Sequence, residues 1–487
     1  MTRALQAEAS PIVSIHVRIL NARHILAAYG GAALSVAIAS STRTVSWILG
    51  GASAESGLAA GEHETGRRLD APNDYLIRFN VRISDACEAP SLLDRILRAL
   101  AVESIIVDGQ EILIAPAVEC FPFANADGNQ PIVSHPSESA RVERPFAGRP
   151  VRAEAGWRER YREEMTRAAD FFDHLRGSRL VLARQAIKEH CGAASALYDE
   201  CLLRIVDHDG VARSCASEIV VLERLGLIRA VDDHVVGLAI KQLRSDPTLR
   251  LGINVSAQSA CLDEWWRWRL LELEEDRSLA KRLTIELTET AGFPAPAVAV
   301  AFVRRLRELG CAVALDDLGA GEHALRDLFE LDPDVVKVDG HFLRWARKSP
   351  RGQAALRSMV RLSLAIGSIV VVEGVESQVD SDLASEAGAQ WQQGYFIERP
   401  RCEFGNPDVI SQKHEVGLMS SDTYTTQSSS VREEPSLTTT PPYKFVVFDP
   451  SDVPGFPLRA LRWALPISLG LWAVIVGGIM LVVSKIS

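Results

Sequence analysis

Two adjacent carboxylates, Asp316 and Asp317, follow the apolar residues 312–315 in the segment AVALDDLGAGEHAL (312–325). Side chains alternate between the two faces of a strand, so neighbouring residues reach the same spot only where a strand ends and turns. Two acids at such a turn can serve a pair of divalent cations about 3.5 to 4 Å apart, which activate water and stabilise a leaving oxygen. The pair therefore predicts metal-assisted hydrolysis of a phosphodiester.

Polar residues interrupt the other apolar runs between residues 179 and 400 in the same way. Within or at the far end of seven successive runs lie Glu200, Asn254, Glu286, Asp316 with Asp317, Lys337, Glu373 and Gln393. Burying one such charge alone would cost several kcal/mol. In a (β/α)8 barrel, however, the strand ends converge on one rim, where barrel enzymes keep their active sites. Oxygen ligands suit hard divalent ions, so we expect a ring that binds Mg2+ or Mn2+.

The elements that must position this ring are eight apolar runs separated by helical patterns. The runs cover residues 179–187, 197–205, 249–257, 282–290, 312–318, 334–340, 368–376 and 392–397. Strands that alternate with helices favour an α/β fold, and eight such strands favour a closed barrel. We therefore predict a (β/α)8 TIM-like barrel over residues 179–405.

Seven motifs within this barrel resemble those of a known family, and they occur in the family's order. They are ECLLR (200–204), NVSAQ (254–258), ELTET (286–290), DDLGAG (316–321), KVDGHFL (337–343), VEGVES (372–377) and QQGYF (392–396). Together they resemble the EAL family of bacterial cyclic di-GMP phosphodiesterases. The resemblance implies an EAL-type barrel that uses two Mg2+ or Mn2+ ions to open cyclic di-GMP to linear 5'-pGpG.

The resemblance also implies a role for each matching residue. The positions that match the family's metal ligands are Glu200, Asn254, Glu286, Asp316 and Asp317, with Asp316 bridging the two ions. Glu373 matches the acid near the attacking water, and Lys337 matches the lysine that orients or activates this water. The substrate-binding positions are Arg204, Gln185 and Gln393, and Glu289 matches the acid that stabilises the loop after the fifth strand.

The chain departs from the family pattern at three places. Cys201 replaces the alanine of Glu-Ala-Leu, and Ala186 replaces the proline of the first strand. In the loop 318–324, LGAGEHA lacks the threonine and serine hydroxyls whose hydrogen bonds order the loop, and in this family that loop supports metal binding and dimerisation. An alternative is therefore a catalytically impaired receptor for cyclic di-GMP or a regulatory scaffold, and a third is a barrel that hydrolyses another phosphodiester. The dependence of cyclic di-GMP binding on metal separates the phosphodiesterase from the receptor.

The amino-terminal residues 11–125 resemble a GGDEF domain, the cyclase fold that commonly precedes an EAL barrel. The signature is absent, because residues 70–76 read DAPNDYL, and no carboxylate occurs between Glu8 and Glu55. We expect a degenerate GGDEF-like domain with a regulatory, docking or dimerising role, and an unrelated α/β sensor is the alternative. Residues 126–178 form the linker and connecting helix. The uncharged stretch 25–40 favours a buried helix over a signal sequence.

The carboxyl-terminal part predicts attachment to a membrane. Residues 406–455 are rich in Ser, Thr and Pro and are typical of a disordered tether. Residues 464–483 contain no charge and are long enough to cross a hydrocarbon core of about 30 Å. Lys444, Arg459 and Arg462 precede them, and Lys485 alone follows. The positive-inside rule then predicts a single-pass protein of the bacterial inner membrane with its catalytic domains in the cytoplasm. The alternative is a buried helix.

Composition limits the partners. The chain has 487 residues, of which 47% are hydrophobic, and a net charge of -10 that disfavours binding to a nucleic acid duplex. Its eight cysteines contain no CxxC pair, which argues against a zinc site and a disulfide framework. The expected partners are cyclic di-GMP, the membrane through the carboxyl-terminal helix, and a second copy through the barrel.

Overall fold

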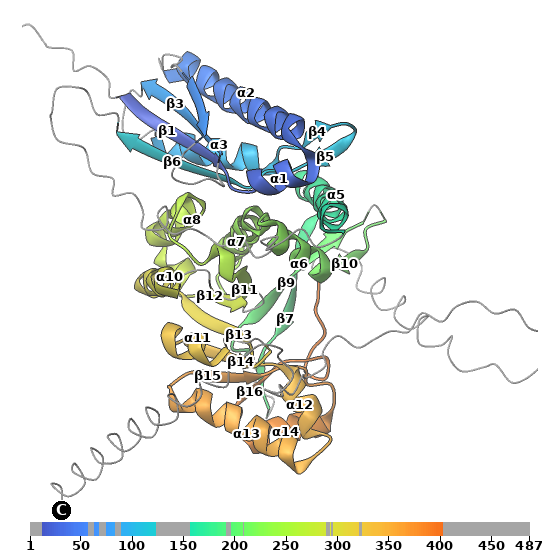
Figure 1. Ribbon diagram of the computed structural model, residues 1–487. Coiled ribbons are helices and arrows are strands. Elements are labelled where there is room, and N and C mark those ends of the chain that lie inside the picture. Colours follow the sequence, from blue (N-terminus) through green and yellow to red (C-terminus); the bar gives the residue numbers. More distant parts are fainter. Residues whose placement is uncertain are drawn as a thin grey trace, which may run out of the picture. The chain divides into compact units, whose positions relative to one another are not determined.

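The computed structural model describes residues 12–56, 63–67, 75–82, 89–122, 156–190, 196–207, 209–288, 293, 296–320 and 324–402 (Figure 1). The amino-terminal part contains a four-stranded antiparallel sheet in the order β2-β3-β1-β6. Its elements are β1 (Ile12–Ile19), α1 (Ala22–Tyr29), α2 (Gly31–Ser56), β2 (His63–Arg67), β3 (Tyr75–Arg82), α3 (Ala89–Val102), β4 (Ile105–Val107), β5 (Gln110–Ile112) and β6 (Pro116–Pro122).

The core of this part follows from residue periodicity. Val13, Ile15 and Val17 of β1 are buried at every second position, as expected for a strand with one face on a core. On α3, Ile96 and Leu100 are buried four residues apart, the spacing of one helix face. The small domain therefore packs helices onto one antiparallel sheet, which is an α+β arrangement instead of the predicted α/β one.

The apolar stretch 25–40 forms two helices. α1 ends at Gly30, whose φ of 90° is the left-handed region, and α2 begins at the next residue. Among the residues that the structure describes, α2 contains the one segment, Gly31–Gly50, that is long and apolar enough to span a membrane. Ala33, Leu34 and Ala37 are nevertheless buried in the core, as the buried-helix prediction requires.

Residues 157–392 contain the second set of elements. These are α5 (Trp157–Arg176), β7 (Leu180–Ala186), β8 (Lys188–Glu189), β9 (Asp199–Val206), β10 (Ala212–Ser214), α6 (Ala216–Leu225), α7 (Ile228–Ser245), β11 (Leu251–Ser256), η2 (Ala257–Ser259), α8 (Glu264–Glu275), α9 (Arg277–Ala280), β12 (Leu283–Thr288), α10 (Pro296–Leu309), β13 (Ala312–Leu318), α11 (Ala324–Leu331), β14 (Val335–Val338), α12 (Gly340–Ala346), α13 (Pro350–Ala365), β15 (Ile369–Val372), α14 (Gln378–Ala387) and β16 (Trp391–Gln392).

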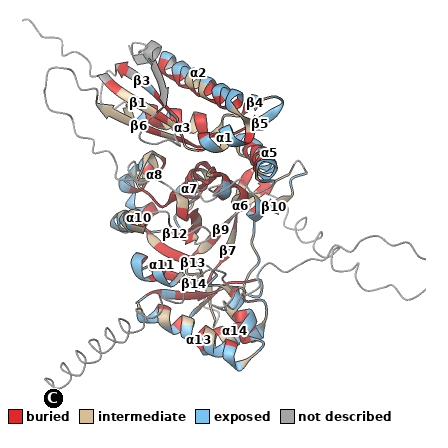
Figure 2. Ribbon diagram, in the orientation of Figure 1, coloured by how far each residue is buried: buried red, intermediate tan, exposed pale blue. Residues whose placement is uncertain are grey.

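These strands form the predicted TIM-like barrel, nearly closed. β9, β11, β12, β13, β14, β15 and β16 pair in that order, each parallel to the next. The segment β7–β8 completes the ring, because β7 pairs with β9 and β8 pairs with β16. Figure 2 shows the barrel strands mostly buried and the outer faces of α13 and α14 exposed. The polar residues on the inner face therefore lie in an apolar shell.

The first strand departs from a regular (β/α)8 barrel, because β7 and β8 run antiparallel to their neighbours. The link between β7 and β9 brings Ile187 opposite Tyr198, with Ile187 N donating to Tyr198 O at 3.1 Å. A parallel pair would need a longer crossover connection, usually a helix. The predicted TIM-like barrel is therefore confirmed, and this first strand is its departure from the regular (β/α)8 pattern.

The aspartate pair lies at a β-bulge and not at the end of a strand. The pairing of β13 with β14 shifts register between Leu315 and Leu318, and β13 continues to Leu318 opposite Val338. Asp317 has a φ of 54°, in the left-handed region. A bulge inserts one extra residue and re-aims its side chain, so both acids can serve one end of the barrel.

Candidate active site

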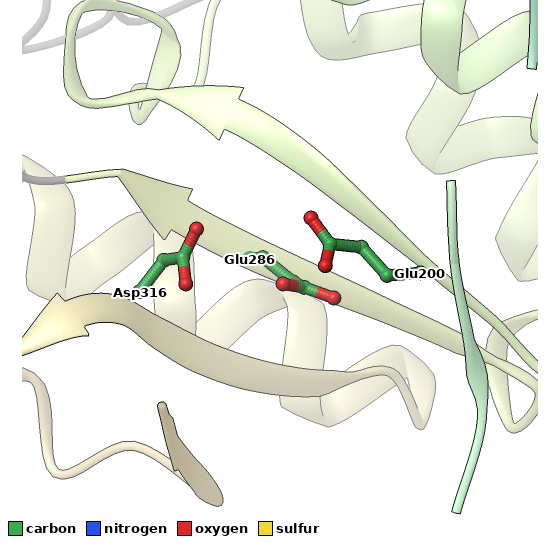
Figure 3. Close-up of side chains that lie close together, drawn as sticks. All are labelled: Glu200, Glu286 and Asp316. Carbon is green, nitrogen blue, oxygen red and sulfur yellow. The ribbon is translucent and has the colours of Figure 1, made fainter. Parts of the chain in front are cut away.

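The predicted ring residues come together from successive strands of the barrel. Glu200 lies on β9, Asn254 on β11, Glu286 on β12, Asp316 and Asp317 on β13, and Lys337 on β14, while Glu373 and Gln393 directly follow β15 and β16. The carboxylates of Glu200, Glu286 and Asp316 point toward one another (Figure 3), and one oxygen from each lies within 4.8 Å of the others. Asp316, Asp317 and Glu373 form a second group of the same size.

Lys337 lies at the centre of the acids. Its Nζ is 3.1 Å from Glu200 Oε2, 2.6 Å from Glu286 Oε2, 3.0 Å from Asp316 Oδ1 and 2.8 Å from Glu373 Oε1. Burial opposes the charge of this side chain, but the four carboxylates hold the pKa of Lys337 well above its ordinary value. One ammonium group nevertheless leaves most of the negative charge of the ring uncompensated.

Glu200 is the most firmly held acid. Asn254 Nδ2 donates a hydrogen bond to its Oε1 at 2.7 Å, and Gln393 Nε2 donates to its Oε2. Burial alone would raise the pKa of Glu200, but Lys337 and the two amides together hold it below its ordinary value. Glu200 therefore stays ionised and oriented, which suits a metal ligand.

The remaining acids resist ionisation. Burial raises the pKa of Glu286 to about 8, and the neighbouring Glu200 and Asp316 carboxylates add to the effect against the attraction of Lys337. Burial and the adjacent Asp316 raise the pKa of Asp317 to about 7. Burial also raises the pKa of Glu373 well above its ordinary value. These groups would ionise fully only if more positive charge entered the ring.

The donor atoms fit a hard divalent cation. Lys337 donates a directed hydrogen bond to Glu200. Its Nζ also pairs with Glu286 Oε2 and Asp316 Oδ1, whereas Glu286 Oε1 and Asn254 Oδ1 are buried with no hydrogen-bond partner among the described residues. Buried oxygens at close range without donors are the ligands that Mg2+ and Mn2+ prefer. The ring is therefore suited to hold metal.

Metal binding should strengthen as pH rises, because a cation must displace protons from carboxyl groups with raised pKa values. Glu286 and Asp317, with pKa values of about 8 and about 7, are partly protonated at neutral pH. Each displaced proton contributes up to about a tenfold gain in affinity per pH unit below the pKa. Titration calorimetry with Mn2+ between pH 6 and pH 9 should show tighter binding up to about pH 8 and proton release near neutrality. An affinity that does not change with pH would contradict these protonation states.

Gly252 makes room for the ring, and it was not predicted. A Cβ atom at this position of β11 would lie 2.1 Å from Glu286 Oε1 and 2.4 Å from Cε2 of Tyr198, a buried tyrosine. Both distances are too short for any side chain. A glycine inside the run LGINVS was the available signal, because a glycine within a strand often marks a close approach of other groups.

The Gly252→Ala variant should therefore lose stability and metal binding together. Overpacking of a full core costs about 1 to 3 kcal/mol, and here the displaced groups are the Glu286 carboxylate and the Tyr198 ring. Urea denaturation and Mn2+ titration measure the two effects. Gly50→Ala is the matched control, because its Cβ would meet nothing within 4 Å. Unchanged Mn2+ affinity in Gly252→Ala would show that the ring tolerates the displacement.

The other predicted residues do not belong to the two acid groups. Gln185 is buried beside the ring, where its Nε2 donates to the carbonyl of Glu398 at 2.8 Å and its Oε1 accepts from Gln393 at 3.3 Å. Arg204 lies four residues after Glu200 on β9, and its Nη1 donates to the carbonyl of Leu203. The substrate roles of these residues stay predictions. Glu289 and the loop residues 321–323 lie outside the described residues.

One further acid near the ring was not predicted. Asp339 follows β14, and its side chain accepts a hydrogen bond from His341 N at 2.6 Å as the cap of α12. Its charge contributes to the raised pKa of Asp317, after burial and Asp316. The sequence signal was an acid two residues after Lys337 at a strand end. Asp339 therefore caps α12 and adds negative charge near the second acid group.

Comparison with known proteins shows what the barrel is similar to. Residues 168–400 match the model of the EAL domain. The chain is 40% identical over 118 residues to the cyclic di-GMP phosphodiesterase RocR of Pseudomonas aeruginosa, covering 24% of this chain and 30% of that protein. It is 33% identical over 196 residues to the cyclic di-GMP phosphodiesterase PA2567 of the same species, covering 38% and 32%. It is 27% identical over 220 residues to PdeF of Escherichia coli, also a cyclic di-GMP phosphodiesterase, covering 43% and 29%. Each match thus spans about a third of the relative's length.

Proposed function

We propose that this chain, whose residues 168–400 match the model of the EAL domain, belongs to that family and hydrolyses cyclic di-GMP to linear 5'-pGpG with two Mg2+ or Mn2+ ions. The observation that carries the proposal is the pair of buried acid groups around Lys337, in which Glu286 Oε1 is buried with no hydrogen-bond partner in the described part of the chain. The names of the related proteins support the same substrate.

The residues of the ring divide into two proposed metal sites. Glu200, Asn254, Glu286 and Asp316 would hold one ion, and Asp316 and Asp317 would hold the other. When bound, the ions supply positive charge to the phosphate and lower the pKa of the attacking water. The protein itself keeps the oxygen ligands apart from bulk water, and hydrogen bonds from Asn254 and Gln393 hold the Glu200 carboxylate in place, which reduces the reorganisation needed on binding.

Two residues would handle the proton of the attacking water. Glu373 has a pKa that burial raises well above its ordinary value, so its carboxylate is basic enough to accept a proton. Lys337 Nζ lies 2.8 Å from Glu373 Oε1 and can donate a hydrogen bond that fixes the carboxylate. Gln185, Gln393 and Arg204 would contact the dinucleotide, and Glu289 would stabilise the loop after the fifth strand.

Turnover of cyclic di-GMP by the purified chain tests the proposal. We expect 5'-pGpG as the product with Mn2+ or Mg2+ and no product in EDTA, measured by chromatography. Cyclic di-GMP that binds in the presence of Mn2+ and is never cleaved would refute hydrolysis.

A second candidate function is a cyclic di-GMP receptor without turnover. One observation favours it: Lys337 alone contacts four of the acids, so the pocket holds internal positive charge without a metal. A receptor should bind cyclic di-GMP equally well in Mn2+ and in EDTA. An enzyme should bind more tightly with the metal, and equilibrium binding in both buffers separates the two.

The proposal extends to the rest of the chain. A degenerate GGDEF-like domain would regulate or dock the barrel, and the barrel would form a homodimer. The tether 406–455 and the helix 464–483 lie outside the described residues, and the support for a single-pass inner-membrane protein is their composition. Removal of residues 464–483 should release the protein from the membrane fraction, with the barrel's turnover unchanged.

A further inference from the structure

The end of β11 lacks its neighbour on one side. The ladder between β11 and β9 stops at Ile253 opposite Cys201, whereas the ladder between β11 and β12 continues to Ser256. Asn254, which donates to Glu200 at 2.7 Å, is the first residue beyond the shorter ladder. The ladder with β9 therefore does not hold this end of the strand, and on that side other groups can fix it.

Two buried acids supply the missing partners. Ser256 N donates to Asp232 Oδ2 at 3.2 Å, and Ser259 Oγ donates to the same oxygen. Ser256 Oγ donates to Glu223 Oε1 at 2.7 Å, and Gln258 Nε2 donates to the backbone carbonyl of Glu223 at 2.9 Å. The strand end is thus bonded to α6 through Glu223 and to α7 through Asp232.

These acids are not surface groups. Glu223 and Asp232 are each 6% exposed, and Ser256 and Ser259 are 4% and 2% exposed. Burial raises the pKa of Asp232 to about 8 and also raises the pKa of Glu223. Burying two carboxyl groups costs free energy that apolar side chains would avoid. Here each carboxyl group accepts a hydrogen bond from the segment 256–259.

We propose that Glu223 and Asp232 are positioning residues that hold the end of β11 so that Asn254 faces Glu200 and the first metal site. The inference rests on the proposed function, because Asn254 is a ligand of the proposed metal site. Ser256 lies two residues after Asn254, about 7 Å along the strand, so its anchors fix the direction of the Asn254 side chain. Groups of this kind do not touch the metal themselves. They orient the side chain that binds it.

Mn2+ binding by four full-length variants tests the inference, with calorimetry and Mn2+ as the sole added ligand. Glu223→Leu and Asp232→Leu remove the acceptors and should weaken Mn2+ binding about 10- to 100-fold. Glu223→Gln and Asp232→Asn keep an oxygen that accepts from Ser256 and should stay near the wild-type affinity. In turnover assays the Leu variants should need more Mn2+ while the KM for cyclic di-GMP at saturating Mn2+ is unchanged.

Matched serine variants keep the test decisive if the Leu variants fail to fold. Ser256→Ala removes one donor to Glu223 and should weaken Mn2+ binding, whereas Ser363→Ala removes a buried serine hydroxyl on α13 and should not. Wild-type Mn2+ affinity in Ser256→Ala and in the folded Leu variants would overturn the positioning role. A chain that binds Mn2+ but never cleaves cyclic di-GMP would instead refute the proposed function, and the Mn2+ series would still decide the positioning role.

Discussion

The Glu373→Gln variant should bind cyclic di-GMP and turn it over about 10²- to 10⁴-fold more slowly, the range that a positioned general base contributes. Glutamine has nearly the same shape as glutamate but cannot accept the proton. The side chain follows β15 and lies 2.8 Å from Lys337 Nζ, so the substitution changes charge at the centre of the ring without opening a cavity. Single-turnover rates at saturating Mn2+ measure the loss.

The control for this variant is Glu376→Gln. Glu376 lies three residues further along the same loop, and its side chain is 62% exposed and 3.3 Å from Arg347. The same chemical change there should leave the rate unchanged. Equal rates in Glu373→Gln and the wild type would remove Glu373 from the mechanism, and loss of Mn2+ binding in Glu373→Gln would make it a ligand instead of a base.

The Lys337→Met variant should lose about 3 to 5 kcal/mol of stability in EDTA, because the substitution leaves several buried carboxyl groups without a cation. The loss should be smaller at pH 6 than at pH 8. Burial raises the pKa of Glu286 to about 8, and removal of the lysine raises it further, so at low pH the acids are protonated and repel one another less. Urea denaturation at both pH values measures the difference.

Two further measurements define the cause of that loss. Mn2+ should restore part of the stability of Lys337→Met, and Glu286→Gln added to it should restore another part by removing one charge. Lys188→Met is the control, because Lys188 is partly exposed and pairs with one acid, Glu398 at 2.7 Å, among the described residues. A Lys337→Met chain as stable as the wild type in EDTA would mean that the acids are already neutral.

The convergence of the ring could be predicted because parallel strands end at one rim and each strand shows alternate residues to the inside. Asn254 and Glu286 illustrate this, since they are direct partners across β11 and β12. The bulge at Asp316 could be anticipated only as a turn, because the left-handed φ of Asp317 depends on how β13 pairs with β14.

Other features depend on contacts between distant segments and escaped prediction. The predicted strand 392–397 is β16, Trp391–Gln392, because at Gly394 the chain turns against Val375 so closely that a Cβ would lie 2.1 Å from its carbonyl oxygen. The direct contact of the Lys337 ammonium with four acids of the predicted ring, and the anchoring of Ser256 by Glu223, also join residues far apart in the sequence. No local pattern specifies such distances.

The antiparallel first strand has a consequence for anyone who wishes to excise the catalytic part. Because β7 and β8 bond to β9 and β16, a fragment that began at Asp199 would leave two unpaired strand edges and would separate Gln393 from Gln185. Exposed edges invite association with other chains, so such a fragment should aggregate. The shortest fragment that keeps the pairing of β7 with β9 and of β8 with β16 begins before Leu180.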